Sequence, residues 1–281
     1  MMAGLLQSEL FRLLRRPMPR ALLAILIVAV AALYLVLWSV LRAQGTGLQP
    51  EQRAQLQDQI RPAMVRSAGL SLVYQIGTVL AVILAASTIA SEFGWGTIRT
   101  VLPRAPGRAP FITVKLAALL LFTVVLVVLG YLVALAASLA LARIEHMDTT
   151  LGDAVVRYTL AALARTLLAM LPYLALAFMV ALWFRSTAPG IGITLAILFL
   201  ENLVSSILRA QGGPLQRIPE AFLALNANAL LQANAAGLPS TSPQAAALPD
   251  AWQAAAVLAA YTVTFVALAY WRFLRRDITV L

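Results

Sequence analysis

The sequence predicts an all-α, polytopic integral membrane protein with six transmembrane helices, and two observations lead to this prediction. First, 62% of the 281 residues are hydrophobic and 11% are charged, whereas soluble proteins are typically about 45–50% apolar and about 25% charged. A soluble fold would expose much of that apolar surface and aggregate. Second, the apolar residues fall into long runs, as expected of helices that satisfy their own backbone hydrogen bonds in lipid.

Six runs are long enough to cross a hydrocarbon core, which needs about 20 residues at about 1.5 Å of helical rise each. They cover residues 21–41, 67–91, 116–142, 158–184, 186–208 and 251–271. Four of them contain no charged residue, whereas the fourth run holds Arg165 and the fifth holds Glu201. The first run is longer than the roughly 7–15 apolar residues of a cleavable signal peptide, so we expect it to be retained as a span.

Arginine and lysine residues predict the orientation of the spans, because they are enriched in cytoplasmic loops. With the N terminus inside, twelve basic residues flank the spans on the cytoplasmic side and eight on the outer side, and Arg165 is the twenty-first. The sequence therefore predicts that both termini are cytoplasmic. It also suggests that the net charge of +10 reflects membrane topology, and we expect no nucleic-acid partner.

The segments outside the spans carry their own patterns. Residues 1–16 predict a cytoplasmic amphipathic helix lying among the lipid headgroups, with its charged residues largely opposite its leucines: Glu9, Arg12, Arg15 and Arg16. The external segment 209–250 holds five prolines. Its middle part, 218–232, predicts a short amphipathic helix that either lies on the outer interface or dips into it.

The cytoplasmic loop 92–115, between the second and third spans, is the most informative segment. It reads EFGWGTIRTVLPRAPGRAPFITVK and is basic, with three glycines and three prolines. Residues 97–102 are long enough for a short helix, because Gly94 and Gly96 allow a turn before it and Pro103 ends it. A rigid, charged helix at the cytoplasmic face is suited to being moved by another protein.

The order of residues in this loop is Glu, then Gly-Thr, a leucine turn, Pro-x-Arg and a lysine: Glu92, Gly96, Thr97, Leu102, Pro106, Arg108 and Lys115. In this order, in its six spans and in its amphipathic N-terminal segment, the chain resembles the permease subunits of bacterial ABC-2 type ABC transporters. Trp95 departs from the pattern.

The resemblance implies a type V exporter-like transmembrane domain in a bacterial inner membrane. It implies that the loop is a coupling helix on which the ATPase subunit docks, and the residues assigned to this docking are Glu92, Gly96, Thr97, Arg99 and Arg108. It further implies two ATPase copies and a second permease subunit, identical or homologous, that together with this chain forms the substrate path of an exporter.

The chain lacks the residues of several enzyme classes. A P-loop requires the pattern G-x-x-x-x-G-K-[ST], and the only lysine, Lys115, stands outside such a pattern. ATP and Mg²⁺ are therefore expected to bind in the partner ATPase. With one histidine, no cysteine and no G-x-S-x-G, we predict no metal site, no catalytic residue and no bound cofactor. Two alternatives stay open: a membrane scaffold or regulator without transport, and an intramembrane lipid-modifying enzyme.

Polar residues within the spans predict two further features. Arg165 and Glu201 lie at similar depth, about 12 Å from the outer ends of neighbouring spans, so we expect an ion pair that is either structural or part of a gate; separate snorkelling of each charge is the alternative. In the second span, one helical stripe is polar: Ser71, Tyr74, Gln75 and Thr78. This stripe either lines the substrate path or bonds to a neighbouring helix.

Overall fold

The computed structural model describes residues 2–43, 49–94, 107–149, 153–211, 218–235 and 248–275, and these residues contain helices and no strands. The elements are α1 Met2–Arg15, α2 Pro17–Ala43, α3 Pro50–Ile60, η1 Pro62–Met64, η2 Val65–Gly69, α4 Leu70–Gly94, α6 Arg108–Ile144, α7 Asp153–Phe184, α8 Thr187–Gln211, α9 Leu223–Gln232, η5 Ala233–Ala235 and α10 Ala251–Arg275. The predicted all-α class is confirmed for this part of the chain.

Six helical stretches are long and apolar enough to cross a membrane, as the sequence predicts. They are Pro17–Ala43, Pro62–Gly94, Arg108–Ile144, Arg157–Phe184, Thr187–Leu208 and Ala251–Arg275. Each coincides with one predicted span, and the differences are confined to the ends. The third is longer than the apolar run that predicted it because α6 begins at Arg108, before the run begins.

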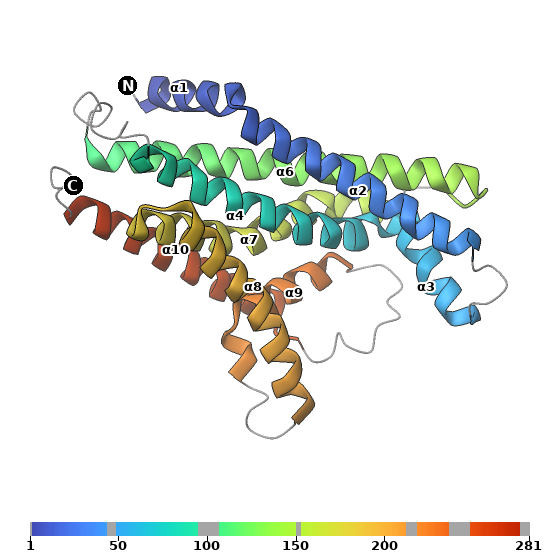
Figure 1. Cartoon of the computed structure of the whole chain (residues 1–281). Coiled ribbons are helices and arrows are strands. Elements are labelled where there is room, and N and C mark those ends of the chain that lie inside the picture. The colour runs from blue at the N-terminus through green and yellow to red at the C-terminus, as the bar shows by residue number, and fades with distance from the viewer. Residues whose placement is uncertain are drawn as a thin grey trace.

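Most of the long helices run lengthwise through one elongated bundle, with the N and C termini at the same end, whereas α8 runs obliquely and its C-terminal half projects from the bundle (Figure 1). We call the end with the two termini the terminal end; it also holds the turn between α7 and α8. The other part of the bundle, from α9 near the middle to the opposite ends of α2, α3 and α6, is called the far end (Figure 1). Helices α4 and α7 form the centre, since 67% and 72% of their most apolar windows are buried. The corresponding shares are 22%, 17% and 17% for α2, α8 and α10, so these helices are peripheral.

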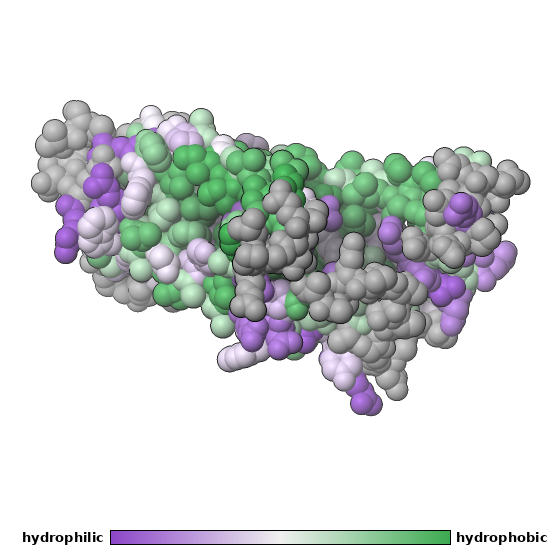
Figure 2. Space-filling model, turned by 90° about the horizontal axis from the view of Figure 1, so that it is seen from below, coloured by the Kyte–Doolittle hydropathy of each residue, from purple (hydrophilic) through white to green (hydrophobic). Residues whose placement is uncertain are grey.

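The exposed faces of the peripheral helices are apolar, as a lipid-facing surface requires. Figure 2 shows hydrophobic residues over the middle of one face, with hydrophilic residues gathered towards the two ends and along one edge. Large exposed side chains include Val28 on α2, Phe199 on α8 and Val263 on α10. The distribution fits a multi-pass membrane protein.

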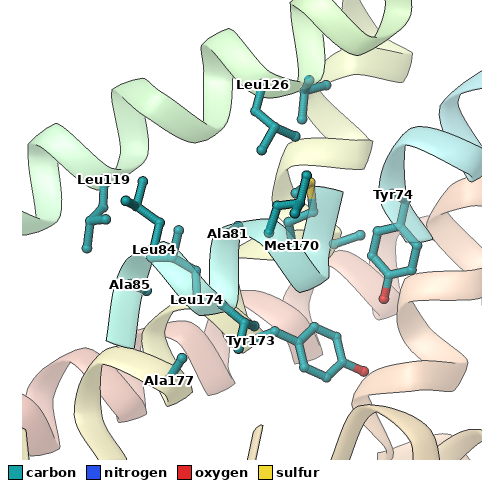
Figure 3. Packing of buried hydrophobic residues seen from close by; sticks show 14 of the residues in the cluster. Tyr74, Ala81, Leu84, Ala85, Leu119, Leu126, Met170, Tyr173, Leu174 and Ala177 are labelled. Carbon is teal, nitrogen blue, oxygen red and sulfur yellow. The ribbon is translucent and has the colours of Figure 1, made fainter. Parts of the chain in front are cut away.

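Close packing at the centre depends on small residues. Figure 3 shows α4 contributing Ala81 and Leu84, while α6 contributes Leu126 and α7 contributes Met170. A Cβ atom at Gly77 of α4 would lie 2.6 Å from Leu126 Cδ2, so a larger residue there would force the Leu126 side chain to move. Helices in membranes use such small residues to bring their backbones together.

Candidate functional site

A buried cluster of charged side chains joins three helices at the terminal end. Lys115, near the start of α6, is 1% exposed. Its Nζ donates hydrogen bonds to Glu9 Oε1 of α1 and to Glu92 Oε1 of α4, each 2.9 Å long. An ammonium buried in apolar surroundings is costly unless carboxylates compensate its charge, and the two glutamates provide that compensation.

Arginines complete this terminal-end cluster. Arg16 Nη2 lies 3.8 Å from Glu92 Oε1, and Arg12 Nη1 lies 3.5 Å from Glu9 Oε2. Because Glu92 lies near the end of α4 and Lys115 near the start of α6, the two helices that flank residues 95–106 are fastened to each other and to α1. Any force on that loop therefore acts on a tied group of three helices.

The cluster changes the interpretation of α1. The expectation that Glu9 lies opposite the apolar face is wrong, because Glu9 is buried together with Leu13. The physical reason is Lys115, which needs a counter-charge on the packed side of α1. Helix α1 lies along the terminal half of α6 (Figure 1).

The predicted docking residues fall into three groups. Glu92 is 2% exposed and its carboxylate is bonded within the chain, so it does not present a surface and the expectation of direct docking through it is corrected. Arg108 is partly buried at the start of α6, where its Nη1 donates to the Leu274 carbonyl of α10 at 3.2 Å. Gly96, Thr97 and Arg99 lie outside the described residues.

The turn between α7 and α8 also contacts the end of α4. Arg185 has a φ of 55°, a left-handed conformation that is uncommon for residues other than glycine and is often found at functional positions. Its guanidinium lies 5.6 Å from the centre of the Phe93 ring. The segment that leads into residues 95–106 is therefore in contact with α1, α6 and the α7–α8 turn.

The predicted ion pair between Arg165 and Glu201 is not formed, because both side chains bind the short helix α9 instead. Glu201 Oε2 accepts a hydrogen bond from the backbone N–H of Ala224 at 2.9 Å. Arg165 Nη1 donates to the carbonyl of Ala233 at 3.1 Å. The anion thus lies at the N-terminal end of α9 and the cation at its C-terminal end, which is the arrangement that stabilises a helix dipole.

Helix α9 is inserted into the bundle, since all but two of its ten residues are buried. This segment is therefore packed against the chain's own helices α7, α8 and α10. Tyr261 of α10 donates to the carbonyl of Ala221 just before α9 at 3.1 Å, and Asn234 just after it donates to Thr166 Oγ1 of α7 at 3.2 Å. We call α9, Glu201 and Arg165 the far-end insertion.

The four residues of the predicted polar stripe do not share one environment. Ser71 and Thr78 donate to backbone carbonyls of their own helix at 2.9 and 2.6 Å. Tyr74 is buried against Tyr173, whose hydroxyl donates to Glu201 at 3.5 Å. Gln75 alone is exposed. Among the described residues, only Tyr74 of the stripe meets a polar side chain of a neighbouring helix, and lining of a substrate path stays a prediction.

A second pair of contacts fastens α2 to α6 at the far end. Glu145 accepts hydrogen bonds from Trp38 Nε1 at 2.7 Å and from Arg42 Nε at 3.1 Å. The bond from Trp38, followed by those from Arg42, holds the pKa of the Glu145 carboxyl below its usual value.

Within the described residues, no three His, Asp or Glu side chains are grouped so as to hold a metal ion.

Sequence reasoning missed the Glu9–Lys115–Glu92 arrangement, although two signals pointed to it. Lys115 is the only lysine of the chain, and it directly precedes a long uncharged run.

Residues 50–279 match a family model described as "Protein of unknown function (DUF2705)". No curated protein matches the chain at a significant level.

Proposed function

The chain belongs to the DUF2705 family, whose description assigns no activity, and from its own geometry we propose that it is the permease subunit of an ABC exporter. In this proposal, the terminal end faces the bacterial cytoplasm and a separate subunit supplies ATP hydrolysis. Two permease subunits, identical or homologous, form the substrate path, and two ATPase subunits dock at residues 91–110.

The observation that carries the proposal is that the two helices flanking residues 95–106 are bonded to each other and packed against the rest of the bundle. The helix before the loop, α4, is central to the bundle and packs against α2, α6, α7 and α8. The helix after it, α6, is bonded to α4 and α1 through Lys115. A displacement of the loop would be transmitted to the core, because a tied, close-packed group of helices moves as a unit.

The far-end insertion provides an element that such a movement could open. Glu201 on α8 and Arg165 on α7 each bond to α9 or its extension, and α7 packs directly against α4. In our proposal, nucleotide-driven movement of α4 and α7 alters these bonds and changes access to the substrate path from the outside.

Co-purification tests this function. The tagged chain is expressed in its native cell, extracted in mild detergent and assayed for a bound P-loop ATPase and for ATP hydrolysis. We expect an ATPase to co-purify, and we expect Arg99→Glu combined with Arg108→Glu to release it. Glu220→Gln, on an exposed residue before α9, is the control and should retain the ATPase.

Two results would contradict the proposal. If no ATPase is bound by the folded wild-type chain, the scaffold or regulator interpretation is favoured. If an ATPase is bound but the double variant retains it fully, docking occurs elsewhere and the role of residues 91–110 is wrong. Size-exclusion chromatography of both variants confirms that they are folded.

A further inference from the structure

Helix α1 has an exposed face on which arginine and aromatic side chains gather. Leu13 and Glu9 lie on its packed side, whereas Phe11, Arg12 and Arg15 are exposed. Phe11 is 56% exposed, and the Arg15 guanidinium lies 4.3 Å from the centre of its ring. A large apolar ring and a cation are therefore presented together, one helical turn apart.

The only acid of α1 does not neutralise this face. Glu9 is buried and bonded to Lys115 at 2.9 Å, so its charge is compensated within the terminal-end cluster. Arg12 reaches Glu9 at 3.5 Å, yet its side chain remains 48% exposed. The exposed face of α1 therefore carries a net positive charge.

The position of α1 in the chain brings this face to a membrane surface. α1 ends at Arg15 and the first membrane-type helix, α2, begins at Pro17, so no linker separates them. Basic residues next to a spanning helix attract anionic headgroups, and an aromatic ring settles at headgroup level. A protein partner is less favoured, because the apolar side of α1 is already covered by α6.

We propose that the exposed face of α1, formed by Phe11, Arg12 and Arg15, binds anionic phospholipid headgroups in the leaflet at the terminal end. The guanidinium groups donate to phosphate oxygens, and Phe11 enters the headgroup layer. This inference does not depend on the transport assignment, because it uses only the charge and exposure of α1.

Lipid-specific quenching tests the proposal on the whole protein. The chain has no cysteine, so Ser8→Cys places a single fluorophore on the exposed face, one helical turn before Arg12. The labelled protein is reconstituted in nanodiscs that contain brominated phosphatidylglycerol or, in a matched set, brominated phosphatidylcholine. We expect phosphatidylglycerol to quench at several-fold lower mole fraction, by about fivefold for each arginine that contacts the headgroups.

Replacing Arg12 and Arg15 with glutamine should remove this preference while leaving the fold intact, because both side chains are exposed and Lys115 still compensates the charge of Glu9. Arg61→Gln, on an exposed residue at the far end, is the control for loss of an arginine elsewhere and should retain the preference. Equal quenching by both lipids in the wild type would overturn the proposal. Shielding of the probe only when an ATPase subunit is bound would also overturn it, since the face would then be a protein-docking surface.

Discussion

The two ends of the bundle satisfy their buried charges in different ways. At the terminal end, Lys115 binds Glu9 and Glu92, so charged side chains compensate one another across three helices. At the far end, Glu201 and Arg165 bind the backbone of an inserted helix. A charge bonded to opposite charges is costly to separate, whereas a charge that caps a helix can exchange its backbone partner for water at lower cost.

This difference assigns distinct mechanical roles to the two ends. The terminal-end cluster holds α1, α4 and α6 together next to residues 95–106, which suits an element that transmits force. The far-end insertion is held by hydrogen bonds to α7, α8 and α10, which suits an element that is released. The following predictions rank from the largest expected effect to the smallest.

Lys115→Met should cause the largest loss of stability. It leaves Glu9 and Glu92 buried without their shared cation, and breaking a buried ion pair typically costs about 3–5 kcal/mol. The expected result is a marked fall in folded yield and in the thermal unfolding midpoint in detergent. Adding Glu9→Gln and Glu92→Gln should restore part of the loss, and an unchanged midpoint in the single variant would show that the cluster is not compensating charge.

Glu201→Leu should destabilise the far end by about 1–3 kcal/mol, because the buried N–H of Ala224 loses its acceptor. Glu201→Gln keeps an acceptor oxygen and should cost less. A double-mutant cycle with Arg165→Gln distinguishes independent capping of α9 by the two side chains from a direct ion pair between them. Independent caps of α9 give additive effects within about 0.5 kcal/mol, whereas a direct ion pair gives a coupling energy above that value.

Gly190→Ala should cost about 1–3 kcal/mol, because overpacking forces the backbones of tightly packed helices apart. The new Cβ would lie 2.8 Å from Ala181 and 2.9 Å from Ala86. Gly192→Ala is the matched control on the same helix, since nothing lies within 4 Å of its Cβ position. It should be neutral or slightly stabilising, and equal destabilisation by both variants would contradict the packing of α8 against α4 and α7.

The smallest expected effect is that of acidification, which should weaken the contact of Glu145 with α2. The lowered pKa of Glu145 means that its contribution is present at neutral pH and is lost as the pH falls through that lowered value. Both partners are partly exposed, so solvent screening limits the contribution to at most about 1 kcal/mol. Thermal unfolding of the wild type and Glu145→Gln should differ at pH 7 and converge once the pH falls below that lowered pKa; a constant difference would contradict this account.

The spans could be predicted because their signal is local. A run such as 116–142 contains no charge, and its length alone determines that it can cross a bilayer. The docking residues at 96–99 remain a prediction, since they lie outside the described part of the chain. The partners and the transport activity also remain predictions.

The charge arrangements could not be predicted in the same way, because they join distant segments. Glu9 and Lys115 are separated by more than 100 residues, and nothing in the N-terminal pattern shows that α1 packs on α6. Equal depth suggested that Arg165 and Glu201 would meet, but depth does not reveal that a third helix binds both of them. The insertion of α9 depends on its tertiary contacts with α7, α8 and α10.

Directional labelling of residues 95–106 tests the central claim most directly. Thr100→Cys provides the only cysteine of the chain, and a membrane-impermeant maleimide is applied to intact cells and to inverted membrane vesicles. The account predicts labelling in inverted vesicles alone, with protection when an ATPase subunit is bound. Labelling from outside intact cells would place the loop on the wrong side of the membrane and contradict docking of a cytoplasmic ATPase.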